Sequence, residues 1–234
     1  MNAVTPAPRP LSHVVNWVFD LDNTLYPRAC NLFAQIDTLI TQYMMTVTRL
    51  GFEEARRLQK DYYRDFGTTL NGLMHRHAVD PDHFLKTVHQ IDYSPVPAQP
   101  RLLAAIRALP GRKFILTNGD VGHARAVLRR LGDGEDIFED IFDIRAMGFK
   151  PKPLPEAYAS FLGAHGLVAA ESAMFDDLEK NLVVPHTVGM ATVQVIAADG
   201  YAHEQVEAWE LEPARGPHVH YTTDDLAGFL EDLG

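Results

Sequence analysis

The sequence has a single cysteine, no long apolar run and few basic residues, and each shortage argues against a class of protein. Cys30 has no second cysteine to pair with, so nothing in the sequence indicates an oxidising compartment. No stretch of about 18 apolar residues occurs, which argues against a membrane-spanning helix. The 21 Lys and Arg residues are outnumbered by 31 Asp and Glu residues, for a net charge of −10, whereas binding to a nucleic-acid polymer needs clustered cations. We therefore expect a cytoplasmic protein with no membrane or nucleic-acid partner.

What the sequence does contain is typical of a globular protein with a substantial core. Its 234 residues are 46% hydrophobic and 22% charged, which is an ordinary balance for a folded protein. A chain of this length buries roughly 70–75% of the surface that it exposes when unfolded. Residues 1–13 carry three prolines and no apolar segment, and are expected to be disordered. We expect either a monomer or a dimer.

Short apolar segments alternate with helical segments over most of the chain. Residues 14–21, rich in β-branched and aromatic side chains, form the first expected strand. Further strands are expected at 113–117, 141–144, 173–175 and 187–195, and helices at 121–131, 156–165, from 178 onwards and at 224–233. Such alternation predicts a parallel sheet with helices on both faces. The expected fold class is therefore α/β, with a doubly wound, Rossmann-like sheet.

After the first expected strand, the periodicity is helical for some 65 residues. Three helices are expected there, the last with Asp80 as its N-cap: 53–66, 68–77 and 81–89. A proline-rich linker at residues 94–100 follows them. The chain is thus expected to divide into a core, residues 14–26 and 95–234, and an inserted all-helical cap, residues 27–94.

Acidic residues gather where the expected strands end. The carboxyl ends of parallel strands meet at one edge of a sheet, and this is where open α/β proteins bind their ligands. Asp20 and Asp22 end the first strand, and Asp176 and Asp177 follow the strand at 173–175. Carboxylates at such density raise one another's pKa unless a cation is bound, and hard oxygen ligands of this kind suit Mg²⁺.

Neutral donors and a lysine complete the pattern. Thr117 and Asn118 end the strand at 113–117 and, with the amides of their turn, can bind phosphate oxygens. Lysine precedes proline twice in a later loop, at Lys150 and Lys152, and either could supply a compensating positive charge. Each motif alone is more often a turn, a helix cap or a solvated loop. Four of them in order, at strand ends or in an adjoining loop, favour a common functional site.

These four motifs resemble those of the haloacid dehalogenase-like hydrolases. FDLDNTLYP, TNGD, KPLPEAY and FDDLEKN stand in the order of that family's motifs, and the resemblance covers the chain from Val14 onwards. It implies an α/β core with a helical cap of the first type inserted after the first strand. It also implies hydrolysis through an aspartate nucleophile, with Mg²⁺ as the cofactor.

Roles for individual residues follow from this resemblance. Asp20 is implied as the nucleophile, and Asp22 as the acid that protonates the leaving group and the base that then activates water. Thr117 and the Asn118 amide would hold phosphoryl oxygens. Lys152 is preferred over Lys150 as the site lysine, because Pro155 and Tyr158 follow Lys152 at the family's spacing.

The resemblance also implies a set of metal ligands. The Asp20 carboxylate, the Asp22 carbonyl and Asp177 would bind Mg²⁺, with Asp176 either ligating through water or standing beside the ligands. Asn181 occupies a position where some relatives carry a further acid, and is expected to form a hydrogen bond instead.

Several stretches, among them the cap segment YYRDFGTTLNGL, are similar to pyrimidine 5′-nucleotidases. This similarity implies a Mg²⁺-dependent phosphomonoester hydrolase that forms an aspartyl-phosphate and acts on a pyrimidine nucleoside 5′-monophosphate. The alternatives are a phosphatase of phosphoglycolate or of a sugar phosphate, a 2-haloacid dehalogenase, and a non-catalytic phospho-receiver-like binding protein. Dehalogenation needs neither a metal nor an acid at Asp22, and receivers are shorter and lack a cap, so the phosphatase is favoured.

Other reactive residue types are interpreted as structural. The eleven histidines show no spacing typical of a metal site and are expected at the surface or packed in a core. Cys30 is expected to be a buried packing residue. Tyr62, Tyr63 and Phe66 recur at helical spacing and are expected in the core of the cap, although one of them could face the cleft.

Overall fold

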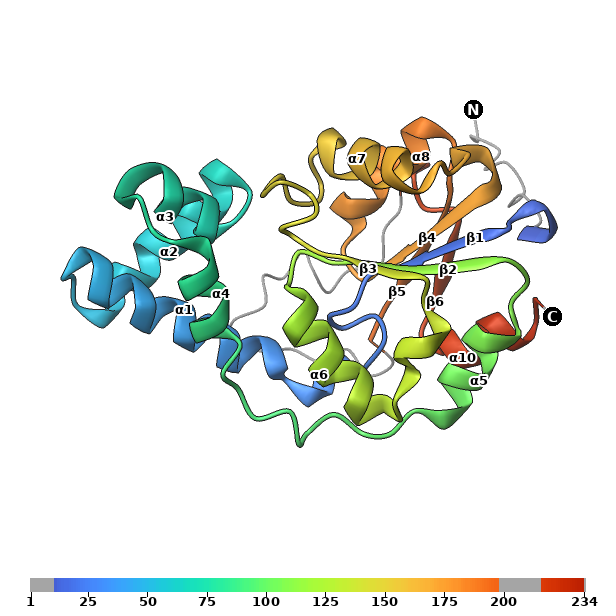
Figure 1. Cartoon of the computed structure of the whole chain (residues 1–234), viewed down its shortest axis with the longest axis horizontal. Coiled ribbons are helices and arrows are strands. Elements are labelled where there is room, and N and C mark those ends of the chain that lie inside the picture. The colour runs from blue at the N-terminus through green and yellow to red at the C-terminus, as the bar shows by residue number, and fades with distance from the viewer. Residues whose placement is uncertain (1–10, 198–215, 234) are drawn as a thin grey trace, which may run out of the picture.

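A parallel sheet forms the centre of the protein (Figure 1). The computed structural model describes residues 11–197 and 216–233, and within them six strands pair in the order β3-β2-β1-β4-β5-β6, all parallel. The strands are β1 (Asn16–Phe19), β2 (Arg112–Leu116), β3 (Asp140–Phe142), β4 (Ser172–Asp176), β5 (Ala191–Val195) and β6 (Tyr221–Thr223). The predicted doubly wound parallel sheet is confirmed.

Helices cover both faces of this sheet (Figure 1). On one face lie α5 (Pro100–Ala108), α6 (Val121–Leu131) and α10 (Leu226–Glu231), and on the other lie α7 (Pro155–His165) and α8 (Val183–Val188). Side chains alternate along β1, so that Trp17 and Phe19 pack into the core beneath the first group and Val18 into the core beneath the second. All four residues of β1 are buried, as expected for a strand in the middle of a sheet that is covered on both faces.

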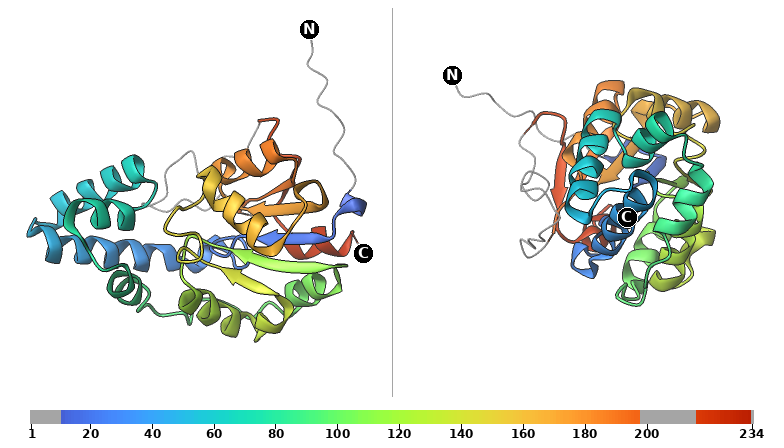
Figure 2. Two further views of the ribbon diagram at one scale, coloured as in Figure 1. Left: turned by 45° about the horizontal axis from the view of Figure 1, so that its top comes forward. Right: turned by 90° about the vertical axis from the view of Figure 1, so that its left-hand side faces the viewer.

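A unit of four helices is inserted between β1 and β2. It consists of α1 (Leu32–Thr48), α2 (Phe52–Phe66), α3 (Thr69–His77) and α4 (Pro81–Val88). Figure 2 shows this unit at one end of the molecule, beside the sheet rather than on either of its faces. Two of its helices begin at side-chain caps, since Thr68 accepts from the Asn71 amide and Asp80 from the Asp82 amide. The expected N-cap at Asp80 is thus present.

The expected disorder of residues 1–13 is wrong for the last three of them. Leu11–His13 form a short 3-10 helix in which Leu11 is buried against the core, while residues 1–10 lie outside the described part of the chain. Helix α5 is not among the expected elements. It begins at Pro100, immediately after the proline-rich linker, because proline fits the first turn of a helix as well as an extended segment.

The strand expected over 187–195 is shorter in the structure. Thr187 and Val188 belong to α8, and the strand begins only at Ala191. Gly189 separates the two elements with a φ of 98°, a left-handed conformation that ends a helix and that residues with a Cβ rarely adopt. The alternation of apolar residues continues across this boundary, which is why it resembles one strand.

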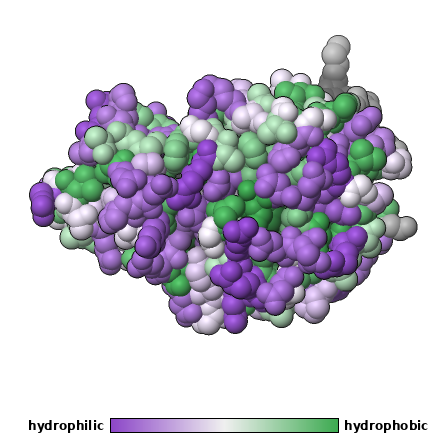
Figure 3. Space-filling model, in the orientation of Figure 1, coloured by the Kyte–Doolittle hydropathy of each residue, from purple (hydrophilic) through white to green (hydrophobic). Residues whose placement is uncertain are grey.

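The surface shows the amphipathic pattern of the covering helices. Figure 3 shows a largely hydrophilic face over both the inserted helices and the sheet layer, with apolar residues scattered between. Among the described helices, none is long and apolar enough to cross a membrane.

The carboxyl ends of β1, β2 and β4 lie at the edge of the sheet nearest the inserted helices, which places Asp20, Thr117 and Asp176 at that edge.

Candidate active site

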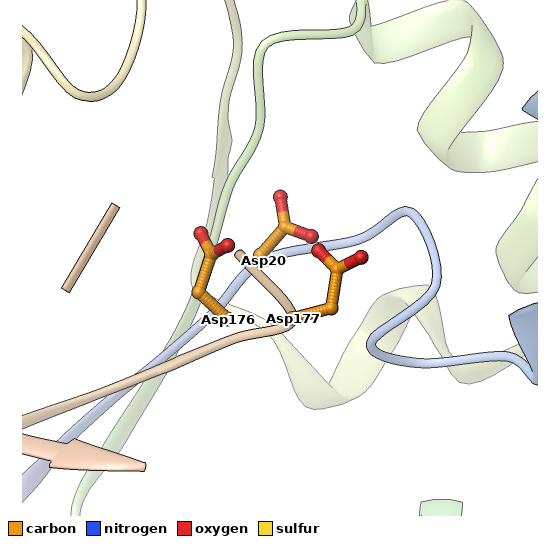
Figure 4. Close-up of side chains that lie close together, drawn as sticks. All are labelled: Asp20, Asp176 and Asp177. Atoms are coloured by element: carbon orange, nitrogen blue, oxygen red, sulfur yellow. The ribbon is translucent and has the colours of Figure 1, made fainter. Parts of the chain in front are cut away.

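Three buried carboxylates meet where β1 and β4 end. Asp20 follows β1, Asp176 is the last residue of β4 and Asp177 comes next in the chain. Each offers one carboxylate oxygen, and these oxygens all lie within 4.8 Å of one another. Figure 4 shows the three side chains grouped at the ends of the two segments. We call Asp20, Asp176 and Asp177 the acidic triad.

Lys152 provides positive charge to this triad. Its side chain is 1% exposed, and Nζ donates hydrogen bonds to Asp20 Oδ1 and to Asp176 Oδ2, each 2.7 Å long. Lys150, the alternative considered from the sequence, is half exposed, with Nζ 3.6 Å from Glu156 Oε1. Of the two lysines, Lys152 is the one that the fold brings to the triad.

Asn118 holds the loop that carries Lys152. Its Nδ2 donates to the Lys152 carbonyl over 3.0 Å, and its Oδ1 accepts from the Lys152 amide over 2.8 Å. The Asn118 side chain is therefore committed to the lysine loop. A phosphate-binding role for Asn118 would have to use its main-chain amide.

The turn after β2 is held by Thr117. This residue is 1% exposed, its amide donates to the Phe142 carbonyl, and its Oγ1 accepts from the Gly119 amide over 3.0 Å. The Thr117 hydroxyl still has a proton to donate, so it can serve the phosphoryl oxygen that the sequence assigns to it.

Burial and mutual repulsion shape the acidity of the triad. Burial, together with the nearby Asp176 and Asp22, raises the pKa of Asp20 to about 7, although Lys152 opposes the shift. Burial and the other two carboxylates hold the pKa of Asp177 well above its usual range. Conversely, Asp176 and Asp20 raise the pKa of Lys152 despite its burial. When ionised, the three carboxylates outnumber their two cationic partners, Lys152 and Arg28, and the remaining charge of −1 favours a bound cation.

Two further hydrogen bonds orient carboxylates of the triad. Thr24 Oγ1 donates to Asp20 Oδ2 over 3.1 Å, and Asn181 Nδ2 donates to Asp176 Oδ1 over 2.9 Å, the hydrogen bond expected of an amide at that position. These bonds orient the carboxylates and still leave converging oxygen donors, which are the ligands that Mg²⁺ prefers. The donor set therefore fits the predicted metal.

Asp22 stands apart from the triad. Its Oδ1 accepts hydrogen bonds from the Tyr26 hydroxyl (2.6 Å) and from His123 Nε2 (2.7 Å). Burial by itself would raise the pKa of Asp22, but His123 and these two hydrogen bonds outweigh it and lower the pKa to about 2. Among the described residues, the carboxylates that converge as possible metal ligands are those of the triad, and the carboxylate of Asp22 is not one of them. A metal contact through the Asp22 carbonyl stays a prediction.

Three residues that contact the site are not predicted from the sequence to do so. Arg28 Nη2 donates to Asp177 Oδ2 over 2.6 Å, while Tyr26 and His123 contact Asp22. Tyr26 stands four residues after Asp22, the one local signal that could have found it. His123 is 1% exposed, so the interpretation of the histidines as surface or packing residues misses its contact with Asp22.

The other residues that the sequence analysis interprets as structural take different positions. Cys30 is partly buried and packs against the sheet core, close to what is expected of it. Tyr62 is buried in the apolar core that the cap shares with one face of the sheet. Tyr63 instead contacts Lys180 of the core, through its hydroxyl and through its ring, whose centroid lies 4.6 Å from Nζ. Of these two tyrosines, Tyr63 is therefore the one that contacts a charged residue of the α/β unit.

Comparison with known proteins places this geometry in a family. A family model described as haloacid dehalogenase-like hydrolase matches residues 17–182, a stretch that contains every site residue described above. The structure of L-2-haloacid dehalogenase from Xanthobacter autotrophicus with chloropropionic acid covalently bound is 14% identical, with a TM-score of 0.56, over 93% of this chain and 97% of that chain. A phosphatase of the haloacid dehalogenase (HAD) type from Thermococcus onnurineus is 17% identical, with a TM-score of 0.59, over 94% and 97%.

A third similar structure carries a metal. The magnesium-bound HAD-hydrolase YfnB from Bacillus subtilis is 16% identical, with a TM-score of 0.55, over 94% of this chain and 99% of that chain. At such identities the likeness shows the fold alone, and the similar structures include both dehalogenases and a phosphatase. The family match covers most of the chain and all of its motifs. The chain therefore belongs to the haloacid dehalogenase-like hydrolase family.

Proposed function

We propose that this hydrolase is a Mg²⁺-dependent phosphomonoesterase that forms an aspartyl-phosphate on Asp20, and that its preferred substrate is a pyrimidine nucleoside 5′-monophosphate. The observation that carries the proposal is the carboxyl group of Asp22. It lies beside the Thr117–Gly119 turn, and two hydrogen bonds hold it in place. An alkoxide leaving group needs a proton, whereas a halide does not, so a fixed acid at this position favours ester hydrolysis over dehalogenation.

In the first step, the Asp20 carboxylate attacks phosphorus. Lys152 and Thr24 hold that carboxylate from its two sides, which limits the rotation that would misalign an in-line attack. In the substrate-free site Asp22 is ionised, but a phosphate dianion bound beside it raises the pKa of Asp22, which takes up a proton when the substrate binds. As the phosphorus–oxygen bond to the leaving group breaks, Asp22 gives this proton to the departing oxygen. The products of this step are the free alcohol and phospho-Asp20.

In the second step, Asp22 acts as a base. It takes a proton from a water molecule, whose oxygen attacks the phosphorus of phospho-Asp20. Inorganic phosphate leaves, Asp20 is again a carboxylate, and Asp22 then releases the proton that it took from water. One residue performs both tasks because the two steps are near mirror images about the same phosphorus atom.

The triad would hold the metal that this chemistry needs. The Asp20 carboxylate, the Asp22 carbonyl and Asp177 are the proposed ligands, with Asp176 either ligating through water or standing beside them. When bound, Mg²⁺ supplies positive charge against the phosphate dianion. Lys152 contributes the same kind of charge from its own side, because its pKa is raised by its two carboxylate partners.

Substrate preference is assigned to the inserted helices. The motifs at the strand ends recognise only the phosphoryl group, so the leaving group must be selected elsewhere. The α2 residue Tyr63, which contacts Lys180 in the core, lies in the YYRDFGTTLNGL segment whose similarity points to pyrimidine nucleotidases. A pocket bounded by such contacts would reject a purine by size, with modest discrimination of roughly 1–3 kcal/mol.

A panel of substrates tests this proposal. We expect Mg²⁺-dependent phosphate release from UMP and CMP with a higher kcat/KM than from AMP, GMP, phosphoglycolate or glucose 6-phosphate. Asp20→Asn should abolish turnover, and Asp22→Asn should lower kcat by roughly 10²–10⁴-fold. Preference for a non-nucleotide would contradict the proposed substrate alone. Release of chloride from L-2-chloropropionate, without release of phosphate from any ester, would contradict the proposed reaction.

A further inference from the structure

The carboxyl group of Asp22 is held by a buried histidine. His123 lies in the first turn of α6, and its Nε2 donates to Asp22 Oδ1 over 2.7 Å, because a carboxylate oxygen can only accept. The Tyr26 hydroxyl donates to the same oxygen over 2.6 Å. Two donors that converge on one oxygen fix the rotation of the carboxyl group.

The other oxygen of Asp22 borders the turn assigned to phosphate. A Cβ built on Gly119 would lie 3.8 Å from Asp22 Oδ2 and 3.3 Å from Thr117 Oγ1. Oδ2 is thus on the side of the carboxyl group where a phosphate ester would lie. With Oδ1 occupied, Oδ2 is the oxygen left to exchange a proton with the leaving group or with water.

His123 is itself held from the side of the inserted helices. The Tyr93 hydroxyl oxygen lies 3.0 Å from His123 Nδ1, and the ring of His89 stacks on that of His123, with 4.6 Å between centroids and 15° between planes. His89 follows directly on α4, and Tyr93 lies with it in the segment 89–99 between α4 and α5. Arg130 of α6 donates to the Ser94 carbonyl over 3.0 Å and ties this segment to α6.

We propose that His123 is a positioning residue for the acid and base Asp22, and that Tyr93 and His89, from the segment between α4 and α5, hold His123 in place. This inference rests on the proposed function. In the first step, the proton on Asp22 Oδ2 passes to the departing ester oxygen while the bond between Asp20 and phosphorus forms. His123 keeps its own protons throughout. Its contribution is to keep Oδ1 occupied, so that Oδ2 is aimed at the ester.

The test compares two aryl esters that differ by one nitro group and therefore in how much their leaving group needs a proton. We would measure kcat/KM for p-nitrophenyl phosphate and for phenyl phosphate, whose phenolate is the more basic, with the Mg²⁺-loaded full chain. The variants are His123→Leu, which removes the donor, and His123→Gln, whose amide can still donate to Asp22. His165→Gln is the matched control, since His165 packs against Phe114, Phe142 and Phe161 on the opposite face of the sheet.

A positioning role predicts unequal losses. His123→Leu should lower kcat/KM for phenyl phosphate at least about 10-fold more than for p-nitrophenyl phosphate, as a fraction of the roughly 10²–10⁴-fold that a general acid contributes. His123→Gln should restore both values to within about 3-fold of wild type. Tyr93→Phe, which removes only a hydroxyl, should show the same imbalance to a smaller extent, and keeps the test informative if His123→Leu does not fold. His165→Gln should leave the ratio unchanged.

The outcomes separate the two proposals. An active wild type in which His123→Leu and Tyr93→Phe leave the ratio of the two esters unchanged overturns the positioning role alone. A folded His123→Gln that is no better than His123→Leu does the same, because a donor would then not be what matters. Wild-type protein that releases phosphate from neither ester overturns the proposed function and this inference with it.

Discussion

The guanidinium of Arg28 donates a 2.6 Å hydrogen bond from Nη2 to Oδ2 of Asp177, and both side chains are less than a tenth exposed. Arg28 comes from the segment that leads from β1 into the inserted helices, and Asp177 from the end of β4. A cation held by Asp177 would lie near this guanidinium. Arg28 is therefore placed to oppose metal binding by charge.

We expect Arg28→Ala to bind Mg²⁺ more tightly than wild type. Removal of one positive charge close to the ligand set should raise affinity by about tenfold, which corresponds to ~1.4 kcal/mol. Isothermal titration calorimetry, in which Mg²⁺ is added to protein that a chelator has freed of metal, measures this affinity directly. Arg28→Lys keeps the charge and should stay nearer to wild type. Weaker binding by Arg28→Ala would show that Arg28 supports the ligands instead.

The two lysines of the loop after β3 should differ sharply on substitution. Lys152→Ala leaves two buried carboxylates without their partner, which typically costs about 3–5 kcal/mol of unfolding free energy and should abolish most activity. Lys150→Ala removes an exposed charge and should change unfolding free energy by less than about 0.5 kcal/mol. Urea unfolding and phosphate release on both variants provide the measurement. Equal losses, or the reverse order, would contradict the assignment of Lys152.

Metal affinity should depend on pH through Asp20. Its pKa of about 7 means that the carboxylate is ionised above pH 7 and available to a cation, whereas below pH 7 a proton must first be displaced. We expect Mg²⁺ affinity to fall by up to about tenfold for each pH unit below 7. Calorimetry at pH 6 and pH 8, in two buffers of different ionisation enthalpy, should show proton release mainly at pH 6. Affinity that is the same at both values would argue against Asp20 as a ligand.

Tyr63 should influence which nucleotide is hydrolysed. Because it reaches from α2 to Lys180, Tyr63→Ala should open the boundary between the inserted helices and the core and lower the preference for UMP over AMP by about tenfold. Phe52→Ala is the control, since Phe52 is exposed at the start of the same helix. The kcat/KM values for the two nucleotides, measured on both variants, decide the matter. An equal shift in both variants would point to general loosening of the helices.

Much of the fold follows from local signals in the sequence. The parallel sheet could be predicted because a buried strand with both faces covered is apolar throughout, as in β1, and alternates along the chain with amphipathic helices. The boundaries of helices and strands are harder to predict where the apolar pattern continues across a change of backbone conformation, as it does across Gly189. There the deciding factor is a backbone angle, which a hydrophobic pattern does not encode.

The site residues likewise fall into those that local motifs predict and those that they do not. Asp20, Thr117, Lys152 and Asp177 could be named from the sequence, because each motif is a short continuous stretch at a strand end or in a loop beside it. The partners Arg28 and His123 could not, because they reach Asp177 and Asp22 across separations of 149 and 101 residues. Local sequence patterns are therefore enough to predict the fold class and to name the motif residues. Which charges face one another depends on how distant segments pack, and so becomes visible only in the folded chain.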